Sequence, residues 1–285
     1  MLLVYNINKQ DKNQGGITLS SKIVNILSNA NFESKKTASA LQDELKKHGY
    51  KPFNGFNKNA ELCVCIGGDG SFIKAVHRNN FPEMPFVGIN TGHLGFYQEI
   101  KPNEIVKFVT DYKNNNYEVQ DIKILRTDIY TKNKVYKLNA INEVVLKAAH
   151  SKTIHMNVFI DRNHVEKFSG DGILVSTPSG STAYNFSTGG SIVYPTLHVL
   201  QMTPISPVSS SAYRSIRSSL IVPGGHTISL VIEKRYKDSN LLLVDGNEYF
   251  FNNLHRVNTR LSNKTIKKLI FSNNSYWDNI KDKFL

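Results

Sequence analysis

The chain has 285 residues, of which 40% are hydrophobic and 20% charged, with 18 glycines and 9 prolines. This is the composition of an ordinary globular protein of about two domains, so it excludes wholesale disorder and collagen-like repetition. The net charge is +12, yet the basic residues are spread along the chain without a nucleic-acid-binding signature, and we expect no nucleic-acid partner.

The predicted compartment is the cytoplasm. No apolar run approaches the roughly 18 residues that cross a membrane, and the opening MLLVYNINKQ lacks the basic leader of a signal peptide. Cys63 and Cys65 lie two positions apart, which puts both on one face of a strand and would strain a disulfide between them. No further metal-ligating residues accompany them, so we expect buried free thiols in a reducing environment.

The first 116 residues alternate between predicted strands and helices. Such alternation is typical of a parallel sheet with helices on both faces, a three-layer, Rossmann-like α/β domain. One predicted helix stops at Gly49, a typical C-terminal cap. The expected strands are 2–7, 61–66 and 85–90. Four helices are expected: two from apolar faces within 17–27 and 38–45, and two over 71–79 and 103–113.

The pattern changes after residue 116. From 117 to about 262 the apolar runs are short, β-branched and separated by turn residues, as in IHMNVFID and TISLVIE. This pattern predicts an all-β, β-sandwich-like domain. Residues 263–285 predict a strand and a terminal helix that packs back on the N-terminal domain, so the expected limits are 1–116, 117–262 and 263–285.

The first motif is GGDG at residues 67–70, between a buried strand and a helix. Its glycines let the backbone approach a ligand, and a helix N-terminus offers free N–H groups to an anion. Asp69 would repel a phosphate, so it makes more sense as a base or a metal-facing carboxylate; a tight turn without function is the alternative. Walker A, GxGxxG, GxSxG and HExxH motifs are absent, and SFIK at 71–74 matches SxxK only by chance.

A second glycine-rich loop, NTGHLGF at residues 90–96, follows the next predicted strand. Ligands of an open parallel sheet bind beyond the carboxyl ends of its strands, where both loops fall. Two such loops at neighbouring strand ends favour a phosphate-rich ligand, and two ordinary turns are the alternative.

Two polar segments stand out in the β region. Asn142 and Glu143 interrupt a strand-like run, where they either bind vicinal ribose hydroxyls or mark a strand edge. Residues 169–190, SGDGILVSTPSGSTAYNFSTGG, concentrate hydroxyl groups and glycines around Asp171. Such a segment is able to present donors to a polar ligand, with Tyr184 as a flat surface for a ring, although a solvated loop is the alternative.

Taken in order, GGDG, NTGHLGF, NE, GDGILVSTPSGSTAYNFSTGG, TPISP and VDG resemble the motifs of the NAD kinase family over about two-thirds of the chain. STPSGSTAY is the most specific of them, because GGDG also occurs in lipid kinases and phosphofructokinases. The resemblance implies transfer of a phosphoryl group from ATP, or from polyphosphate, to the 2′-hydroxyl of the adenosine ribose of NAD, giving NADP. It also implies that the β domain binds NAD, that Mg²⁺ accompanies ATP, and that the protein is a homodimer or homotetramer.

On this resemblance Asp69 is the catalytic proton acceptor, and no protein ligand for the metal can be named. The residues assigned to nucleotide binding are Gly67, Gly68, Gly70, Lys74, Asn142, Glu143, His155, Ser169, Asp171, Ser179, Thr182, Ala183, Tyr184, Asn185, Phe186, Ser187, Ser206, Asp245 and Asn247.

Two positions depart from the family pattern. Many members carry arginine before the second GDG where this chain has Ser169, so Lys167, His164 or a partner subunit would have to replace that cation. Asn247 follows VDG where a longer amide is common. Two other functions fit part of the pattern: a lipid or sugar kinase, against which STPSGSTAY argues, and an inactive dinucleotide-binding protein, against which the intact Asp69 argues.

Overall fold

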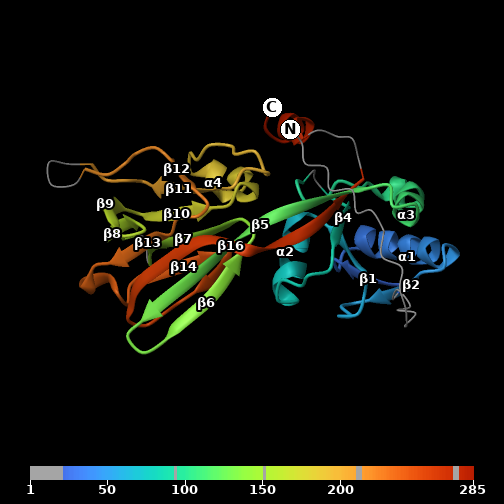
Figure 1. Cartoon of the computed structure of the whole chain (residues 1–285), viewed down its shortest axis with the longest axis horizontal. Helices are drawn as coiled ribbons and strands as arrows, with labels where there is room; N and C mark the ends of the chain where they lie inside the picture. Colours follow the sequence, from blue (N-terminus) through green and yellow to red (C-terminus); the bar gives the residue numbers. More distant parts are fainter. Residues whose placement is uncertain (1–21, 93–94, 150–151, 210–213, 272–275) are drawn as a thin grey trace, which may run out of the picture.

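The computed structural model describes residues 22–92, 95–149, 152–209, 214–271 and 276–285. Figure 1 shows an α/β region and a β region side by side, with two long strands, β5 and β16, running from one into the other. The elements of the α/β region are β1 (Ile23–Ser28), α1 (Phe32–Lys47), β2 (Lys51–Asn54), β3 (Leu62–Gly67), α2 (Asp69–Arg78), β4 (Phe86–Asn90), η1 (Pro102–Glu104) and α3 (Ile105–Lys113).

The α/β region has the predicted three layers. Its strands pair in parallel in the order β2-β1-β3-β4, and every residue of β3 is buried, as in parallel sheets that are covered on both faces. Leu41 of α1 and Phe108 of α3 pack against one face of the sheet. Phe72 of α2 packs against the other face, beside the free, buried thiols of Cys63 and Cys65.

The predicted helix over 17–27 is wrong in its described part, because Ile23–Ser28 is strand β1. The run IVNILS is short and rich in β-branched residues, so its spacing fits either element, and pairing with β3 decides for the strand. The predicted strand over 2–7 lies outside the described residues. The other predicted elements of this region are confirmed, and Gly49, with a φ of 82°, follows the end of α1.

The β region consists of two packed sheets. Its elements are β5 (Glu118–Thr131), β6 (Val135–Ala140), β7 (Glu143–Ala148), β8 (Ile154–Ile160), β9 (Asn163–Gly170), β10 (Gly172–Ser176), η2 (Ser179–Thr182), α4 (Tyr184–Ser187), β11 (Val199–Ile205), β12 (Leu220–Pro223), β13 (Ile228–Ile232), η3 (Lys234–Tyr236), β14 (Asn240–Val244), β15 (Asn247–Tyr249) and β16 (Leu254–Ile270). One sheet has the antiparallel order β12-β11-β10-β7-β14-β15, and the other contains β16, β13, β8 and β9.

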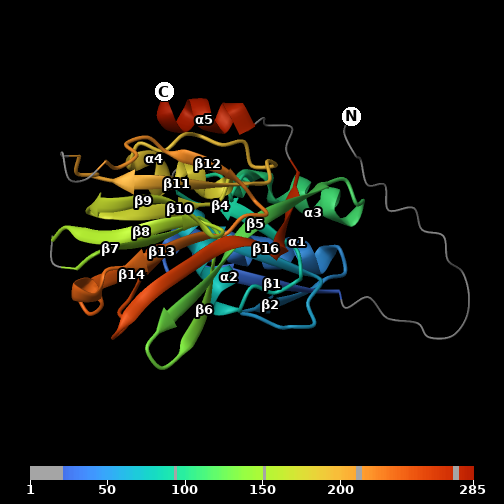
Figure 2. The same ribbon diagram turned by 60° about the vertical axis from the view of Figure 1, so that its left-hand side comes forward.

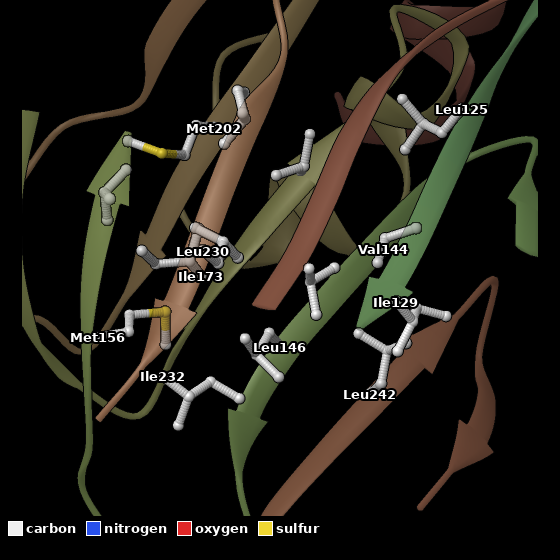
Figure 3. Packing of buried hydrophobic residues seen from close by; sticks show 14 of the residues in the cluster. Leu125, Ile129, Val144, Leu146, Met156, Ile173, Met202, Leu230, Ile232 and Leu242 are labelled. Atoms are coloured by element: carbon white, nitrogen blue, oxygen red, sulfur yellow. The ribbon is translucent and has the colours of Figure 1, made fainter. Parts of the chain in front are cut away.

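The core between these sheets is apolar on both sides (Figure 3). Leu146 of β7 and Ile173 of β10 face Met156 of β8 and Leu230 of β13 in one buried cluster. Burial of this apolar surface is the main force that stabilises such a sandwich. The predicted β-sandwich-like architecture is confirmed.

Strand β16 joins the two regions. It pairs with β5 over most of its length, with β13 in the β region, and with β4 at Lys268, so the parallel sheet continues into the sandwich. The expected division between 262 and 263 falls inside this strand, and the domain limits stay a prediction.

Helix α5 (Tyr276–Phe284) ends the chain on the outside of the molecule, alongside α4 (Figure 2). Among the described residues, no helix has the length and apolar character needed to cross a membrane.

Candidate active site

The GGDG turn joins the buried strand β3 to the N-terminus of α2. Gly67 has a φ of 151°, which favours glycine, and a side chain there would collide with Ser71 and Asn29. Side chains at Gly68 or Gly70 would meet nothing within 4 Å, so the start of α2 faces open space. Because the first N–H groups of a helix have no acceptor within it, this turn is able to bind a phosphate group.

Asp69 is the first residue of α2, and the loop after β4 fixes its carboxylate. The backbone N–H of Phe96 donates to Oδ2 at 3.0 Å, and that of Tyr97 donates to Oδ1 at 2.9 Å. Gly95 lies so close that a Cβ there would overlap the carboxylate. The side chain of Asp69 is still 24% exposed. The two glycine-rich loops therefore meet, and they hold a carboxylate that a ligand can reach.

A lysine from the C-terminal helix reaches the same carboxylate. Nζ of Lys283 lies 3.7 Å from Oδ2 of Asp69 and 4.7 Å from the centre of the Phe96 ring. The sequence did not predict this contact, because Lys283 belongs to no motif and lies at the far end of the chain.

Tyr97 connects the loop of Asp69 to the Asn142–Glu143 pair. Its hydroxyl donates to Oδ1 of Asn142 at 2.6 Å, and only 4% of Tyr97 is exposed. Burial, together with the carboxylates of Asp69, Asp245 and Glu143, raises the pKa of Tyr97 well above its usual value. Tyr97 therefore stays a neutral donor and holds Asn142 in one orientation. It was not predicted, although it directly follows NTGHLGF.

Asp245 of the VDG turn lies beneath the Asn142–Glu143 pair. Its carboxylate accepts the backbone N–H groups of Ile141, Asn142 and Glu143 at 2.7, 2.8 and 3.1 Å. Nε2 of His77, on α2, lies 2.7 Å from Oδ2, and the Asp245 side chain has no exposed surface. We predicted Asp245 as a nucleotide contact, which stays a prediction; in the structure its oxygens point inward and bond the Asn142–Glu143 backbone and His77 of α2.

Glu143 is 6% exposed, and its Oε2 has no hydrogen-bond partner among the described residues. Burial, and then the nearby Asp245 carboxylate, raise the pKa of Glu143 to about 8. The carboxyl group is therefore largely protonated at neutral pH and is able to donate a hydrogen bond to a polar ligand.

The STPSGSTAYNFS segment folds over the end of β10 as η2 and α4. The backbone N–H of Gly180 donates to Oγ1 of Thr177, and a side chain at Gly180 would collide with the backbone of Asn142, so this segment closes on the polar pair. Asn185 is fully buried, and its side chain bonds to Ser181 and Thr203 within the fold. The predicted residues on the outside of this segment are Tyr184, Phe186 and Ser187, whereas Thr182 is buried and Ala183 partly buried.

Four predicted residues gather at the opposite end of β10. His155 pairs with Ser169 across β8 and β9, and Asp171 and Ser206 adjoin the ends of β9, β10 and β11. Glu143 pairs with Ser176, at the end of β10 next to the Asp69 loop. Ser176 is four residues from Gly172, so the two ends of β10 are roughly 13 Å apart along the strand. The structure thus separates His155, Ser169, Asp171 and Ser206 from the residues around Asp69. We call these four the far group.

Two further predicted residues are Lys74 and Asn247. Lys74 is exposed on α2, and the side chain of Asn247 donates to the carbonyl of Val244. Of the cations proposed to replace the family arginine, Lys167 pairs with Glu233 at 2.9 Å and His164 lies 3.1 Å from Asn157.

A cavity of about 490 Å³ lies beside the turn after β4. Its lining includes Thr91 and Gly92 of the NTGHLGF loop, the buried Gln98, and Asn279 and Asp282 of α5. Its volume is within the usual range of ligand sites. A larger cavity, of about 920 Å³, lies between α3 and α5, and neither cavity is lined by a residue that was assigned to nucleotide binding.

Comparison with known proteins supports the family resemblance. The ATP-NAD kinase N-terminal domain matches residues 10–117, and the ATP-NAD kinase C-terminal domain matches residues 141–268. The chain is 48% identical to the NAD kinase of Finegoldia magna over 93% of this chain and 99% of that protein. It is 32% identical to the NAD kinase of Streptococcus pneumoniae (strain Hungary19A-6) over 93% of this chain and 97% of that protein.

Solved structures show the same fold. The crystal structure of yeast NADH kinase complexed with NADH matches with a TM-score of 0.80 and 21% identity, over 93% of this chain and 87% of that chain. The NAD kinase from Archaeoglobus fulgidus in complex with ATP matches with a TM-score of 0.70 and 22% identity, over 91% and 98%. From the matched domains and the identity to these relatives, the chain belongs to the NAD kinase family and is a phosphotransferase of that family.

Proposed function

We propose that the protein transfers the γ-phosphoryl group of ATP to the 2′-hydroxyl of the adenosine ribose of NAD, giving NADP, with Asp69 as proton acceptor. The observation that carries this proposal is the partly exposed carboxylate of Asp69 at a helix N-terminus that faces open space. The helix N-terminus suits a phosphate group, and the carboxylate beside it suits the proton of an attacking hydroxyl. The names of the relatives point to NAD as the acceptor.

In this reaction the protein mainly positions the reactants, because the transition state of phosphoryl transfer is loose. The free N–H groups at the start of α2 bind phosphate oxygens. The amides of Phe96 and Tyr97 hold Asp69 in one orientation. As the ribose oxygen bonds to the γ-phosphorus and the bond to ADP breaks, the hydroxyl proton moves to the Asp69 carboxylate.

The Asn142–Glu143 pair is suited to hold the ribose. Asn142 is oriented by Tyr97, and the protonated carboxyl of Glu143 has a free hydrogen-bonding atom. Together they offer both donors and acceptors to two neighbouring hydroxyl groups. The exposed ring of Tyr184 is available to stack on a base.

We also propose that Mg²⁺ accompanies ATP. Among the described residues, no three or more His, Cys, Asp or Glu side chains form a metal-binding group. Mg²⁺ is commonly bound by substrate phosphates, so the triphosphate of ATP would supply ligands for it at the start of α2. Such an ion would neutralise charge on the phosphoryl group.

The far group supports a homo-oligomer in our proposal. If His155, Ser169, Asp171 and Ser206 bind nucleotide, they are placed to do so for a site other than the one at Asp69, such as that of a partner subunit. Light scattering of the purified protein would test whether it is a dimer or tetramer. We keep a cytoplasmic location as a proposal, supported by the free thiols of Cys63 and Cys65.

The test compares the wild type with Asp69→Asn. We expect NADP formation from NAD, ATP and Mg²⁺ in the wild type and a rate about 10²–10⁴-fold lower in the variant, the usual size of general-base catalysis. Calorimetry should show that both proteins bind NAD. Binding without NADP formation in the wild type would instead indicate an inactive dinucleotide-binding protein, and activity on a sphingoid base or a sugar in place of NAD would indicate the related kinases.

A further inference from the structure

Helix α5 is attached to both sides of the candidate site. The ring of Phe284 lies 4.4 Å from that of Phe186 on α4 and 6.2 Å from that of Phe96 in the loop of Asp69, between ring centres. Tyr276, at the start of the helix, contacts the rings of Tyr194 and Phe96 at 5.1 and 5.8 Å. These contacts come from the β region and from the α/β region, so they fix the position of α5 over the site.

This packing brings one ammonium group to the reactive carboxylate. Nζ of Lys283 lies 3.7 Å from Oδ2 of Asp69, and within the described part of the chain this is the ion pair that Asp69 makes. The Lys283 side chain is 34% exposed and that of Asp69 is 24% exposed, so solvent reaches the pair. An ammonium carries three N–H donors. The distance of 3.7 Å to Asp69 is longer than a hydrogen bond, so these donors remain available to a second acceptor.

The phosphate position is next to this ammonium. Asp69 is the first residue of α2, and the start of α2 faces open space at Gly68 and Gly70. A phosphoryl group placed there would meet a negative carboxylate, which repels it. A cation at the same carboxylate offsets that repulsion and stabilises the charge on the phosphoryl oxygens in the transition state.

We propose that Lys283 is a second catalytic residue, which pairs with Asp69 in the free enzyme and contacts the transferred phosphoryl group during the reaction. The inference rests on the function proposed above. When the ammonium moves to the phosphoryl oxygens, the Asp69 carboxylate is released to accept the ribose proton. Helix α5 then belongs to the active site, although no motif marks it.

The test uses Lys283→Gln, which removes the charge, Lys283→Arg, which keeps it, and Lys281→Gln as a control. Lys281 is exposed on the same helix and lines neither cavity. We expect K283Q to lower kcat by about 10²-fold, with the KM for NAD within about twofold of the wild type, because the contact forms with the phosphoryl group rather than with NAD. K283R should recover part of the loss, and K281Q should match the wild type.

Measurements of kcat, KM and NAD binding on each full-length protein decide the outcome. If the wild type forms no NADP, the proposed function fails and this inference fails with it. If the wild type is active, three results overturn the role of Lys283 and leave the function standing. These are a K283Q rate within about twofold of the wild type, a K283Q rate above the wild type, or equal losses in K283Q and K283R that come with lost NAD binding.

Discussion

The two regions of the molecule position their site residues by different means. In the α/β region, Asp69 lies at a strand-to-helix turn, and the amides of Phe96 and Tyr97 in the neighbouring loop hold its carboxylate. In the β region, the Asn142–Glu143 pair is held from below by Asp245, which is about a hundred residues further along the chain. The first arrangement depends on glycines that allow a close approach, and the second depends on the pairing of β7 with β14.

This difference explains why the loop of Asp69 can be recognised from its motif, whereas the support of the Asn142–Glu143 pair cannot. Gly95 and Gly67 must be glycines for reasons of space, and such positions are visible in a sequence. The contact between Asp245 and His77 joins the β region to α2, and nothing in the local sequence of either residue predicts it. Three experiments test this contrast.

The largest expected effect comes from Gly95→Ala. A Cβ at this position would overlap the Asp69 carboxylate, so the side chain must move from its two amide donors. We expect a loss of activity close to that of Asp69→Asn, about 10²–10⁴-fold. Gly225→Ala is the control, because a Cβ there meets nothing within 4 Å. Steady-state assays that find G95A as active as G225A would show that the geometry of this loop does not matter.

The next effect is on stability, from Asp245→Ala. This change leaves three backbone N–H groups and His77 without their acceptor in a buried place. We expect the free energy of unfolding to fall by about 3–5 kcal/mol, the range for breaking a buried pair. Asp161→Ala is the matched control, because Asp161 pairs with His226 at 2.6 Å on the surface, where little stability should be lost. Equal urea midpoints for the two variants would contradict a supporting role for Asp245.

The smallest expected effect is the contribution of Glu143 to the pH dependence of the free energy of unfolding. Its pKa is raised to about 8 from the usual 4.5, so below pH 4.5 the carboxyl is protonated in both the folded and the unfolded chain. As the pH rises toward 8, the unfolded chain loses this proton first, and the folded state loses relative stability. Glu143→Gln removes the titration, so the stability of the wild type relative to E143Q should fall by about 2 kcal/mol from roughly pH 6.5 to pH 9.

Urea denaturation of the wild type, E143Q and the exposed-site control Glu248→Gln at both pH values measures this difference. The E248Q variant should keep the pH dependence of the wild type, because Glu248 is exposed on β15. An E143Q variant with the same pH dependence as the wild type would mean that Glu143 is ionised in the folded protein.

The fold follows from the sequence wherever local pattern and tertiary environment agree. Strand β3 is continuously apolar because both of its faces are buried, and α1 and α3 show clear apolar faces. Strand β1 was mistaken for a helix because a short apolar run fits both elements. Strand β2, with the sequence KPFN, was not predicted, since it is short, contains proline and lies at the edge of the sheet.

The motifs of the candidate site could be predicted from the sequence, but not which of their residues lie together in the structure. Because GGDG and NTGHLGF each follow a predicted strand, both loops were expected beyond the carboxyl ends of the sheet, and in the structure they meet at Asp69. In the sequence, Ser169 and Asp171 belong to the same motif as STPSGSTAY. In the structure, strand β10 lies between them, so Asp171 and STPSGSTAY are at opposite ends of that strand. Tyr97, His77 and Lys283 were not predicted, because their importance comes from residues distant in the chain.

The amino-acid sequence alone determined the family, the alternation of helices and strands, and the motifs proposed for phosphoryl transfer, because motif chemistry and hydrophobic period are local properties. Only the tertiary structure decided that Asp245 faces inward, that the far group lies apart from Asp69, and that Lys283 reaches it. These three placements depend on strand register and on the packing of α5 against both regions. Both are determined by the burial of apolar surface between segments that are distant in the sequence, not by neighbouring residues.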